Sequence, residues 1–295
     1  MYFCVKCSAK IYNKTWKCNS CGWTPEFQNG FPMLAPALAA GIANFPADSH
    51  DLLAKIEADS FWFVSRNKLI SYLLDRFFPN AGRMLEIGCG TGFVLSGLAQ
   101  HRPEMSFFGA EAYPSGLKHA QKRVPKAEYA QMDACQIPFS EEFDVVGAFD
   151  VLEHIQDDKK AFQEINKALM SEGGIIITVP RYHWLWTKTD EKSGHKRRYT
   201  KAEMRKKIEA AGFHILMMTS FISLLLPFML AYRWINILSN KKFDGKTKAI
   251  LRLPGIVNSI FINICTQERR FIKLGVPLPF GGSLVCVAKK RRDDA

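Results

Sequence analysis

The feature that most limits the fold of this chain is a regular alternation of short apolar segments with helical ones between residues 83 and 179. Five segments have the composition of buried strands: 83–87, 106–111, 127–132, 143–149 and 174–179. Helical patterns lie between them, near 92–101, 115–123 and 157–170. Apolar strands separated by helices form a parallel sheet that is covered on both faces. We therefore expect an α/β fold in which ligands bind beyond the carboxyl ends of the strands.

A glycine-rich motif, EIGCGTG, follows the first predicted strand and opens the first predicted helix. Gly88, Gly90 and Gly92 allow a tight turn and let the backbone approach a ligand without interference from a Cβ atom. A dinucleotide-binding fingerprint would need a third glycine where Phe93 stands. No Gly-Lys-Ser/Thr sequence follows either, so the motif is not that of a P-loop.

Acidic residues stand at or just after the ends of the first four predicted strands. They are Glu86, Glu111, Asp133 and Asp150. Glu111 comes 23 residues after Gly88, where a carboxylate can accept hydrogen bonds from both hydroxyls of a ribose. Asp133 is placed to accept from an adenine amino group. Carboxylates at these four positions suit a nucleoside that carries a positive charge, and they do not suit a polyphosphate.

Taken in order, these motifs resemble those of the class I S-adenosylmethionine-dependent methyltransferases, of the bacterial type 11/23. The resemblance runs from about Glu57 to Gly212 and includes the Asp-Ala pair at 133–134 and the D-x-L-E-H sequence at 150–154. It implies a seven-stranded Rossmann-like sheet whose final strand is residues 284–288.

The resemblance also implies how S-adenosylmethionine would bind. The cofactor would lie across Gly88–Gly92, with Glu111 on the ribose, and Asp133 and Ala134 would hold the adenine. Proteins of this family often cover the cofactor with an N-terminal helix, and Phe61, Trp62 and Arg66 match that helix here. The predicted cofactor-binding residues are Glu86, Gly88, Gly90, Gly92, Glu111, Asp133, Ala134, Asp150, Trp62 and Arg66.

Four cysteines at the start of the chain, Cys4, Cys7, Cys18 and Cys21, form two C-x-x-C pairs. Such pairs can place four thiolates tetrahedrally around Zn²⁺, at about 2.3 Å from the metal. Because so short a segment has too little core to fold alone, metal binding would supply its stability. A catalytic zinc would keep an open position and use histidine or carboxylate ligands, so we expect structural zinc. A redox dithiol is disfavoured because no βαβ pattern surrounds the cysteines.

The expected organisation has five parts. They are a zinc ribbon at 1–24, a linker at 25–47, an S-adenosylmethionine-binding domain at 48–219, an apolar and basic insertion at 220–280, and a final strand with a basic tail at 281–295. Within the binding domain, Thr200 and Glu203 have the spacing of a capping box at the start of a helix that ends near Ala211.

Positive charge is concentrated in the last part of the chain. Residues 1–180 hold 17 Lys+Arg and 20 Asp+Glu, whereas residues 181–295 hold 23 and 8, a net charge of +15. The apolar segment 221–238 and the basic residues that follow it at 241–252 fit a helix lying on an anionic bilayer. They fit a substrate-covering subdomain or a dimer surface about equally well, and the oligomeric state stays open.

We expect a cytoplasmic protein, or one peripheral on the inner face of the membrane. The N-terminus lacks the apolar core of a signal peptide, and the longest apolar run is far shorter than the roughly 20 residues of a spanning helix.

Methyl transfer from a sulfonium is an in-line displacement, for which the enzyme mainly positions the reactants. A hydroxyl acceptor also needs a base, because its pKa is far above 7. His154 follows the fourth strand and His195 lies in the loop after the fifth. Because a histidine side chain ordinarily titrates near neutrality, either could be the base, and we favour His195. Asp150 is the third catalytic candidate.

The same loop carries the predicted substrate-binding residues Trp184, Arg197, Arg198 and Tyr199. Aromatic rings with two adjacent arginines suit an acceptor that has a ring or apolar portion and an anionic group.

Three functions remain open at this point. The first is an S-adenosylmethionine-dependent methyltransferase acting on a small-molecule or lipid-linked acceptor, with O-methylation favoured. The second is a zinc-ribbon RNA methyltransferase, since the basic C-terminal part would attract phosphates. The D-V-L-E-H motif disfavours it, because many amino-directed nucleic-acid methyltransferases have N/D-P-P-Y/F there. The third is a non-catalytic zinc-ribbon scaffold, because binding motifs do not prove turnover.

Overall fold

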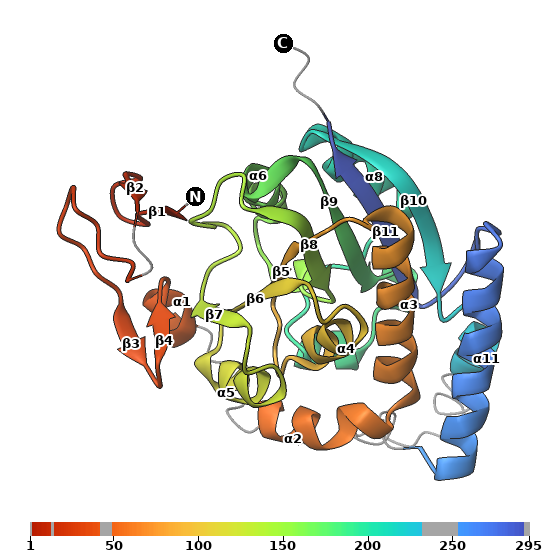
Figure 1. Ribbon diagram of the computed structural model, residues 1–295. Helices are drawn as coiled ribbons and strands as arrows, with labels where there is room; N and C mark the ends of the chain where they lie inside the picture. The colour runs from red at the N-terminus through yellow and green to blue at the C-terminus, as the bar shows by residue number, and fades with distance from the viewer. Residues whose placement is uncertain (1, 13–14, 42–48, 232–252, 292–295) are drawn as a thin grey trace.

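A mixed β-sheet forms the centre of the computed structural model, which describes residues 2–12, 15–41, 49–231 and 253–291 (Figure 1). Nine strands of this described part form the sheet, in the order β10-β11-β9-β8-β5-β6-β7-β4-β3. Their bounds are β3 (Glu26–Gln28), β4 (Phe31–Met33), β5 (Arg83–Ile87), β6 (Ser106–Glu111), β7 (Glu128–Gln131), β8 (Phe143–Phe149), β9 (Leu169–Pro180), β10 (Phe213–Phe221) and β11 (Ser283–Lys290). Strands β5 to β9 pair in parallel, and β11 lies antiparallel between β9 and β10.

The predicted α/β class and the five predicted parallel strands are confirmed, and β11 supplies the predicted final strand. The sheet differs from the prediction in size: nine described strands share it, where seven were expected. The two additional strands, β3 and β4, come from the segment that was expected to be a linker.

Strands β3 and β4 form a hairpin that extends the sheet beyond β7. The turn between them is Asn29-Gly30, and both residues have positive φ, 55° and 85°, as a two-residue hairpin turn of this type requires. The Gln131 side chain fixes the hairpin to β7, because its Nε2 donates to the Ala35 carbonyl at 2.8 Å and its Oε1 accepts from the Ala35 N–H at 2.9 Å. The Asn-Gly pair was therefore a strand signal within the supposed linker.

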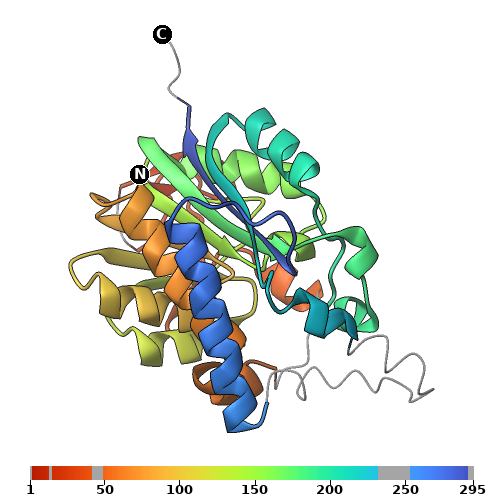
Figure 2. The same ribbon diagram turned by 90° about the vertical axis from the view of Figure 1, so that its right-hand side faces the viewer.

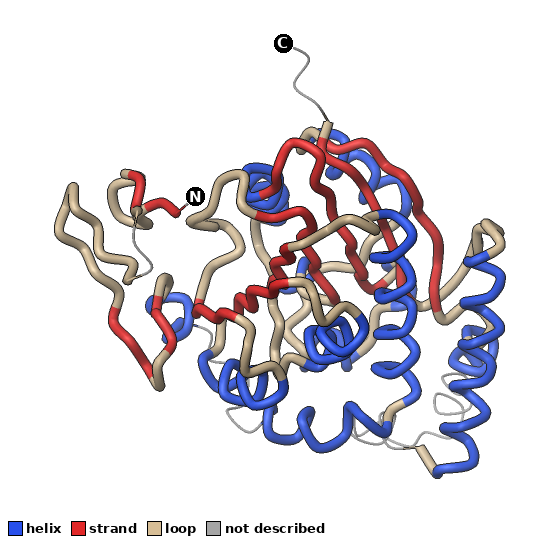
Figure 3. The backbone as a smooth tube through the Cα atoms, in the orientation of Figure 1, coloured by secondary structure: helices blue, strands red, loops and turns tan. Residues whose placement is uncertain are grey.

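Helices cover both faces of the sheet (Figure 3). Their bounds are α1 (Pro36–Gly41), α2 (Ser49–Ile56), η1 (Glu57–Asp59), α3 (Phe61–Phe77), α4 (Phe93–His101), α5 (Pro114–Arg123), η2 (Leu152–His154), α6 (Asp158–Ala168), η3 (His183–Leu185), α7 (Lys188–Lys192), α8 (Lys201–Ala210) and α11 (Gly255–Lys273). The capping box predicted for α8 is present, because Thr200 and Glu203 each bond the other's backbone N–H.

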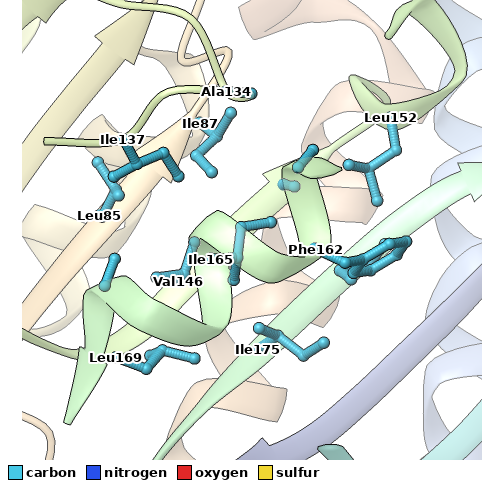
Figure 4. Close-up of a cluster of buried hydrophobic side chains, with 14 of the residues drawn as sticks. Leu85, Ile87, Ala134, Ile137, Val146, Leu152, Phe162, Ile165, Leu169 and Ile175 are labelled. Carbon is cyan, nitrogen blue, oxygen red and sulfur yellow. The ribbon is translucent and has the colours of Figure 1, made fainter. Parts of the chain in front are cut away.

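Two hydrophobic cores lie on opposite faces of the sheet, because successive strand residues point to opposite sides. On one face, Phe162 and Ile165 of α6 pack over Val146 and Ile175 (Figure 4). On the other face the core joins the sheet to α3, α4 and α5. Burial on both faces is the reason that the parallel strands were recognisable as continuous apolar runs.

Helix α11 lies alongside α3 on the second face (Figure 2). The ring of Phe261 packs edge-on against Phe61 with centroids 5.1 Å apart, and Cys265 is fully buried. The predicted apolar segment 221–238 is described only as far as residue 231, and the basic stretch 241–252 lies outside the described residues. Among the helices that the structure describes, none has the length and apolar character to cross a bilayer.

Candidate active site

The glycine motif forms a loop between β5 and α4 in which all three glycines have positive φ: 65° at Gly88, 51° at Gly90 and 73° at Gly92. A Cβ atom on Gly88 would lie 2.3 Å from Cγ2 of Val151, and one on Gly92 would lie 2.6 Å from Cα of Ala120. A Cβ atom on Gly90 would meet nothing within 4 Å. Gly88 and Gly92 are therefore required by packing, whereas Gly90 borders open space that a ligand can enter.

Glu111 ends β6 with its carboxylate directed at this loop. Its Oε2 accepts from the Gly90 N–H at 2.8 Å and its Oε1 from the Tyr113 N–H at 3.0 Å. Burial raises the pKa of Glu111, although these backbone donors oppose the shift. The carboxylate therefore lies against the glycine loop, next to the predicted position of the cofactor ribose. Its contact with the ribose stays a prediction.

Asp133 and Ala134 lie in the loop after β7. Oδ1 of Asp133 accepts from the Cys135 N–H at 2.8 Å, which fixes the turn, and Ala134 is buried beside Ile137 in the first core. Their predicted contact with adenine stays a prediction.

Glu86 is buried at the end of β5, with 2% of its surface exposed. Burial raises its pKa well above the usual value, and Arg66 acts in the opposite direction. Among the described residues its Oε2 has no hydrogen-bond partner. An orphaned buried oxygen next to the glycine loop is what a site for a hydrogen-bonding ligand would leave without that ligand.

The predicted covering helix is α3, and it brings three of the predicted residues together. Arg66 forms an ion pair with Asp150, and its guanidinium lies 4.2 Å from the ring centroid of Trp62. Asp150 also accepts from the Thr178 hydroxyl at 3.0 Å and has a φ of 58°. Trp62, Arg66 and Asp150 thus connect the covering helix to the end of β8.

A second cluster, which sequence reasoning missed, fastens η1 to the glycine loop. Glu57, 4% exposed, accepts from the Thr91 hydroxyl at 2.6 Å and from the Arg123 guanidinium at 2.7 Å. Arg123 also donates to the Thr91 carbonyl at 3.2 Å. Only Thr91 lies in a recognisable motif, and neither charged residue has a local pattern that would identify it.

Two candidate catalytic histidines meet beside the end of β8. The rings of His154 and His195 pack edge-on with centroids 4.8 Å apart. His195 Nδ1 lies 2.9 Å from Oδ1 of Asp190, and the Lys196 N–H donates to the Glu153 carbonyl at 2.7 Å. Burial, with a smaller contribution from His195, lowers the pKa of His154 to about 4, although part of the residue surface is exposed to solvent.

Both predicted substrate-binding arginines are held by carboxylates. Arg198 donates to both oxygens of Asp190 at 2.8 Å and 3.0 Å, and Arg197 lies 3.0 Å from Asp158. Although burial opposes the shift, hydrogen bonds from His195 and Arg198 lower the pKa of Asp190. The two guanidiniums therefore have structural partners, and their contact with an acceptor stays a prediction.

The two predicted aromatic residues differ in environment. Tyr199 is buried, and its hydroxyl donates to Oδ2 of Asp158 at 2.9 Å and lies 3.1 Å from the Leu152 carbonyl. Trp184 is 61% exposed and stacks on Tyr182. Tyr199 thus has a structural position, and Trp184 is free to contact an acceptor.

The four N-terminal cysteines converge. Their Sγ atoms all lie within 4.8 Å of one another, with 3.7 Å between Cys4 and Cys21 and 3.6 Å between Cys7 and Cys18. Four sulfurs at about 2.3 Å from a tetrahedral Zn²⁺ would be about 3.8 Å apart. Two of the sulfur pairs match this spacing, and all four sulfurs lie close enough together to be candidate ligands of one ion.

The cysteine-bearing segment, with β1 (Tyr2–Phe3) and β2 (Lys10–Ile11), docks on the loop that leads from Asp133 to β8. Trp16 stacks on Tyr2 with centroids 4.9 Å apart, and both rings pack edge-on against Phe139. The Gln136 amide donates to the Val5 carbonyl at 2.6 Å. The ribbon thus supports the loop on which Asp133 and Ala134 stand.

Comparisons with known proteins agree with this geometry. The methyltransferase domain family matches residues 85–177. A protein of Mycolicibacterium smegmatis, named as an S-adenosylmethionine-dependent methyltransferase, is 24% identical over 174 residues, 58% of this chain and 66% of its own length. A demethylmenaquinone methyltransferase of Thermotoga maritima is 25% identical over 135 residues, 44% of this chain and 56% of its own. The chain thus spans roughly half to two thirds of these relatives.

A solved structure has the same fold. It is phosphoethanolamine N-methyltransferase 2 of Haemonchus contortus in complex with S-adenosylmethionine, which is 20% identical. It superposes with a TM-score of 0.51 over 76% of this chain and 52% of its own length. Together with the glycine loop, the acidic end of β6 and the D-x-L-E-H turn, these matches identify residues 85–177 as a methyltransferase domain and support a class I S-adenosylmethionine-dependent methyltransferase.

Proposed function

We propose that this protein transfers the methyl group of S-adenosylmethionine to a hydroxyl of a small-molecule or lipid-linked acceptor. The observation that carries the proposal is the position of the His154–His195 pair. The pair follows Asp150 at the end of β8, and β8 is the direct neighbour of β5, which leads into the glycine loop. A hydroxyl that enters beside the histidines would therefore lie close to a cofactor seated on the loop.

The cofactor half of the site has donors and acceptors that fit a nucleoside with a sulfonium group. Glu111 and the open face of Gly90 would hold the ribose end, and Asp133 and Ala134 the adenine. The unpaired oxygen of Glu86 offers a hydrogen-bonding position for the amino-acid end of the cofactor, and the Asp150 carboxylate supplies negative charge near the sulfonium. When bound, S-adenosylmethionine supplies an electrophilic methyl group, and the protein positions the acceptor in line with it.

The acceptor half would remove a proton from the hydroxyl. His195 holds Asp190 through Nδ1, so Nε2 is the nitrogen that remains to accept a proton. The buried Asp190 carboxylate orients the ring, as carboxylates do for catalytic histidines. O-methylation assisted by His195 is the form of the reaction that this arrangement favours.

The acceptor itself is inferred only as a class. The relatives are named for different acceptors, demethylmenaquinone in one case and phosphoethanolamine in another. Trp184 and the arginine-bearing loop support an acceptor with a ring or apolar part and an anionic group.

For the cysteine cluster we propose a structural Zn²⁺. The four thiolates would use all of its tetrahedral positions, which leaves none for chemistry. Its function would be to stabilise the ribbon and thereby the loop of Asp133 and Ala134.

Peripheral membrane binding is a further part of the proposal, because it would bring a lipid-linked acceptor to the site. Several apolar side chains on and after α11 are exposed, among them Ile256 (79%), Leu274 (78%) and Phe280 (62%), and Arg270 and Lys273 lie nearby. Flotation with anionic liposomes at low salt tests this, and a protein that stays entirely unbound contradicts it.

RNA is the second candidate acceptor, and the net charge of +15 in residues 181–295 favours it. Binding to bulk RNA that weakens steeply with salt would support RNA over a small acceptor.

Calorimetry with S-adenosylmethionine and S-adenosylhomocysteine tests the cofactor site directly. We expect saturable binding of both. No binding at millimolar ligand would overturn the proposal and favour a non-catalytic scaffold.

A further inference from the structure

We propose that Glu153, His154 and His195 bind a divalent transition-metal ion beside the cofactor cleft, at a second site separate from the cysteine cluster. The metal site itself stands on the geometry of these three side chains. Its consequence for catalysis rests on the function proposed above.

The three side chains come from two segments that a backbone hydrogen bond holds together, from the Lys196 N–H to the Glu153 carbonyl. Glu153 and His154 lie in the turn η2, and His195 lies in the loop after α7. One ligand atom from each residue lies within 4.8 Å of the other two. Tetrahedral ligands at about 2.1 Å from one ion are about 3.4 Å apart, so the side chains would rotate inward to close the site.

Glu153 gives a second, independent indication of a ligand. Its side chain is fully buried, and neither carboxylate oxygen has a hydrogen-bond partner among the described residues. A buried carboxylate without partners is costly, because its solvation by water is lost and nothing replaces it. Arg66 and Arg198 act on it only at a distance, while Asp150 adds a second negative charge. Because Asp150 is already paired with Arg66, Glu153 is the carboxylate that a bound cation would compensate.

His195 has the arrangement of a metal-ligating histidine. Its Nδ1 is 2.9 Å from the buried carboxylate of Asp190, which leaves Nε2 as the ring nitrogen that can bind an ion. Metal-bound histidines commonly hold a carboxylate through the second ring nitrogen, which fixes the ring and its tautomer. Asp190 is itself held by Arg198 and Thr187, so the support is rigid.

The donor set indicates the class of metal. Two imidazoles and one carboxylate suit Zn²⁺, Fe²⁺, Co²⁺ or Mn²⁺, and three protein ligands leave positions open. An open position beside the cofactor cleft can receive oxygen from an acceptor. We infer that the acceptor has a hydroxyl with a second oxygen donor close to it, so that both can reach the ion.

A cation would change how the hydroxyl loses its proton. Imidazole nitrogens that bind an ion cannot also accept a proton, so the ion would take over the role assigned above to the His195 base. The ion lowers the pKa of a nearby hydroxyl. The proton leaves to solvent, the O–CH₃ bond forms and the S–CH₃ bond breaks, giving a methyl ether and S-adenosylhomocysteine.

Cobalt titration of the zinc-loaded full-length protein tests the site, because Co²⁺ reports its ligands by absorption. We expect about one equivalent of Co²⁺ to bind with the weak visible bands of nitrogen and oxygen ligands, in addition to one retained zinc. E153Q and H195Q should weaken this binding at least tenfold and keep the zinc. H183Q is the matched control, since His183 is an exposed histidine paired with Glu203, and it should bind like the wild type.

Two results would overturn the inference. One is a wild type that takes up cobalt only with thiolate charge-transfer bands. The other is unchanged cobalt binding in folded E153Q and H195Q. If these variants do not fold, addition of Mn²⁺ to the wild type must broaden the imidazole NMR signals of His154 and His195, and unbroadened signals refute the site.

Failure of the metal site and failure of the proposed function can be told apart. The titration needs neither cofactor nor acceptor. A protein that binds S-adenosylmethionine but no second metal removes only the metal site, and the reverse result removes only the methyltransferase proposal.

Discussion

Alanine substitution of single glycines in the glycine loop should separate a residue needed for ligand binding from one needed for packing. In Gly90→Ala the new Cβ meets no atom within 4 Å, so the structural cost is that of an L-residue at a φ of 51°. That cost is about 1–2 kcal/mol, less about 0.4–1 kcal/mol from the reduced entropy of the unfolded chain, or about 1 kcal/mol net. Because the Cβ enters the space proposed for the cofactor, S-adenosylmethionine affinity should fall at least about tenfold, or 1.4 kcal/mol.

Gly92→Ala should mainly lower the stability of the fold. Its Cβ would lie 2.6 Å from the backbone Cα of Ala120, which cannot move away as a flexible side chain can. Overpacking adds about 1–3 kcal/mol to the backbone cost, so the total loss of unfolding free energy should be about 2–4 kcal/mol.

Gly275→Ala is the matched control. Gly275 has a φ of 79°, nothing within 4 Å of its Cβ position, and lies just beyond α11, away from the loop. It should lose about as much stability as Gly90→Ala and keep full cofactor affinity. Urea unfolding and calorimetry measure the two quantities. Wild-type affinity in Gly90→Ala, or equal stability of the Gly90 and Gly92 variants, would refute the reasoning.

Three other predictions follow from the structure. Removing zinc with a chelator, or Cys18→Ser, should lower the melting temperature and weaken S-adenosylmethionine binding, because the ribbon supports the Asp133 loop; calorimetry that shows unchanged affinity contradicts this. Arg123→Met leaves buried Glu57 without its cation and should cost about 2–4 kcal/mol in urea unfolding, whereas Arg205→Met in the exposed Arg205–Glu209 pair should cost at most about 0.5 kcal/mol. Burial lowers the pKa of His50 to about 4, so below about pH 6.5 the unfolded chain binds a proton at this residue that the folded chain does not bind. Up to about 3 kcal/mol of stability is therefore lost as the pH falls from about 6.5 to 4. His50→Gln should remove this contribution and make the dependence of the unfolding free energy on pH less steep.

Local patterns were sufficient to predict the central part of the fold. The parallel strands are apolar along their length because both faces are buried, and the glycine loop has a spacing that few folds require. The helix that begins after Thr200 was also predictable, because the groups of its capping box all lie within one turn of the chain.

Long-range interactions were not predictable in this way. Glu57 and Arg123 are 66 positions apart, and nothing local to either residue indicates the ion pair that holds the glycine loop. The meeting of His154 with His195 depends on how the loop after β9 folds back over η2. The Asn29-Gly30 turn was a visible hairpin signal, but the strands beside it are only three residues long each and have no clear alternation.

Different interactions hold the cofactor half and the acceptor half of the proposed site in place. The protein could therefore change its acceptor without losing its cofactor. The cofactor half depends on the Glu57–Arg123 pair and on the ribbon-supported loop after β7. The acceptor half depends on Asp190, whose carboxylate accepts from Thr187, His195 and Arg198 and is 1% exposed. Among the described residues the two supports share no hydrogen bond, and Asp150, paired with Arg66 of α3, lies where they meet. Because each support is anchored by its own buried carboxylate, changes in the loop of His195 can alter the acceptor while the glycine loop keeps its geometry.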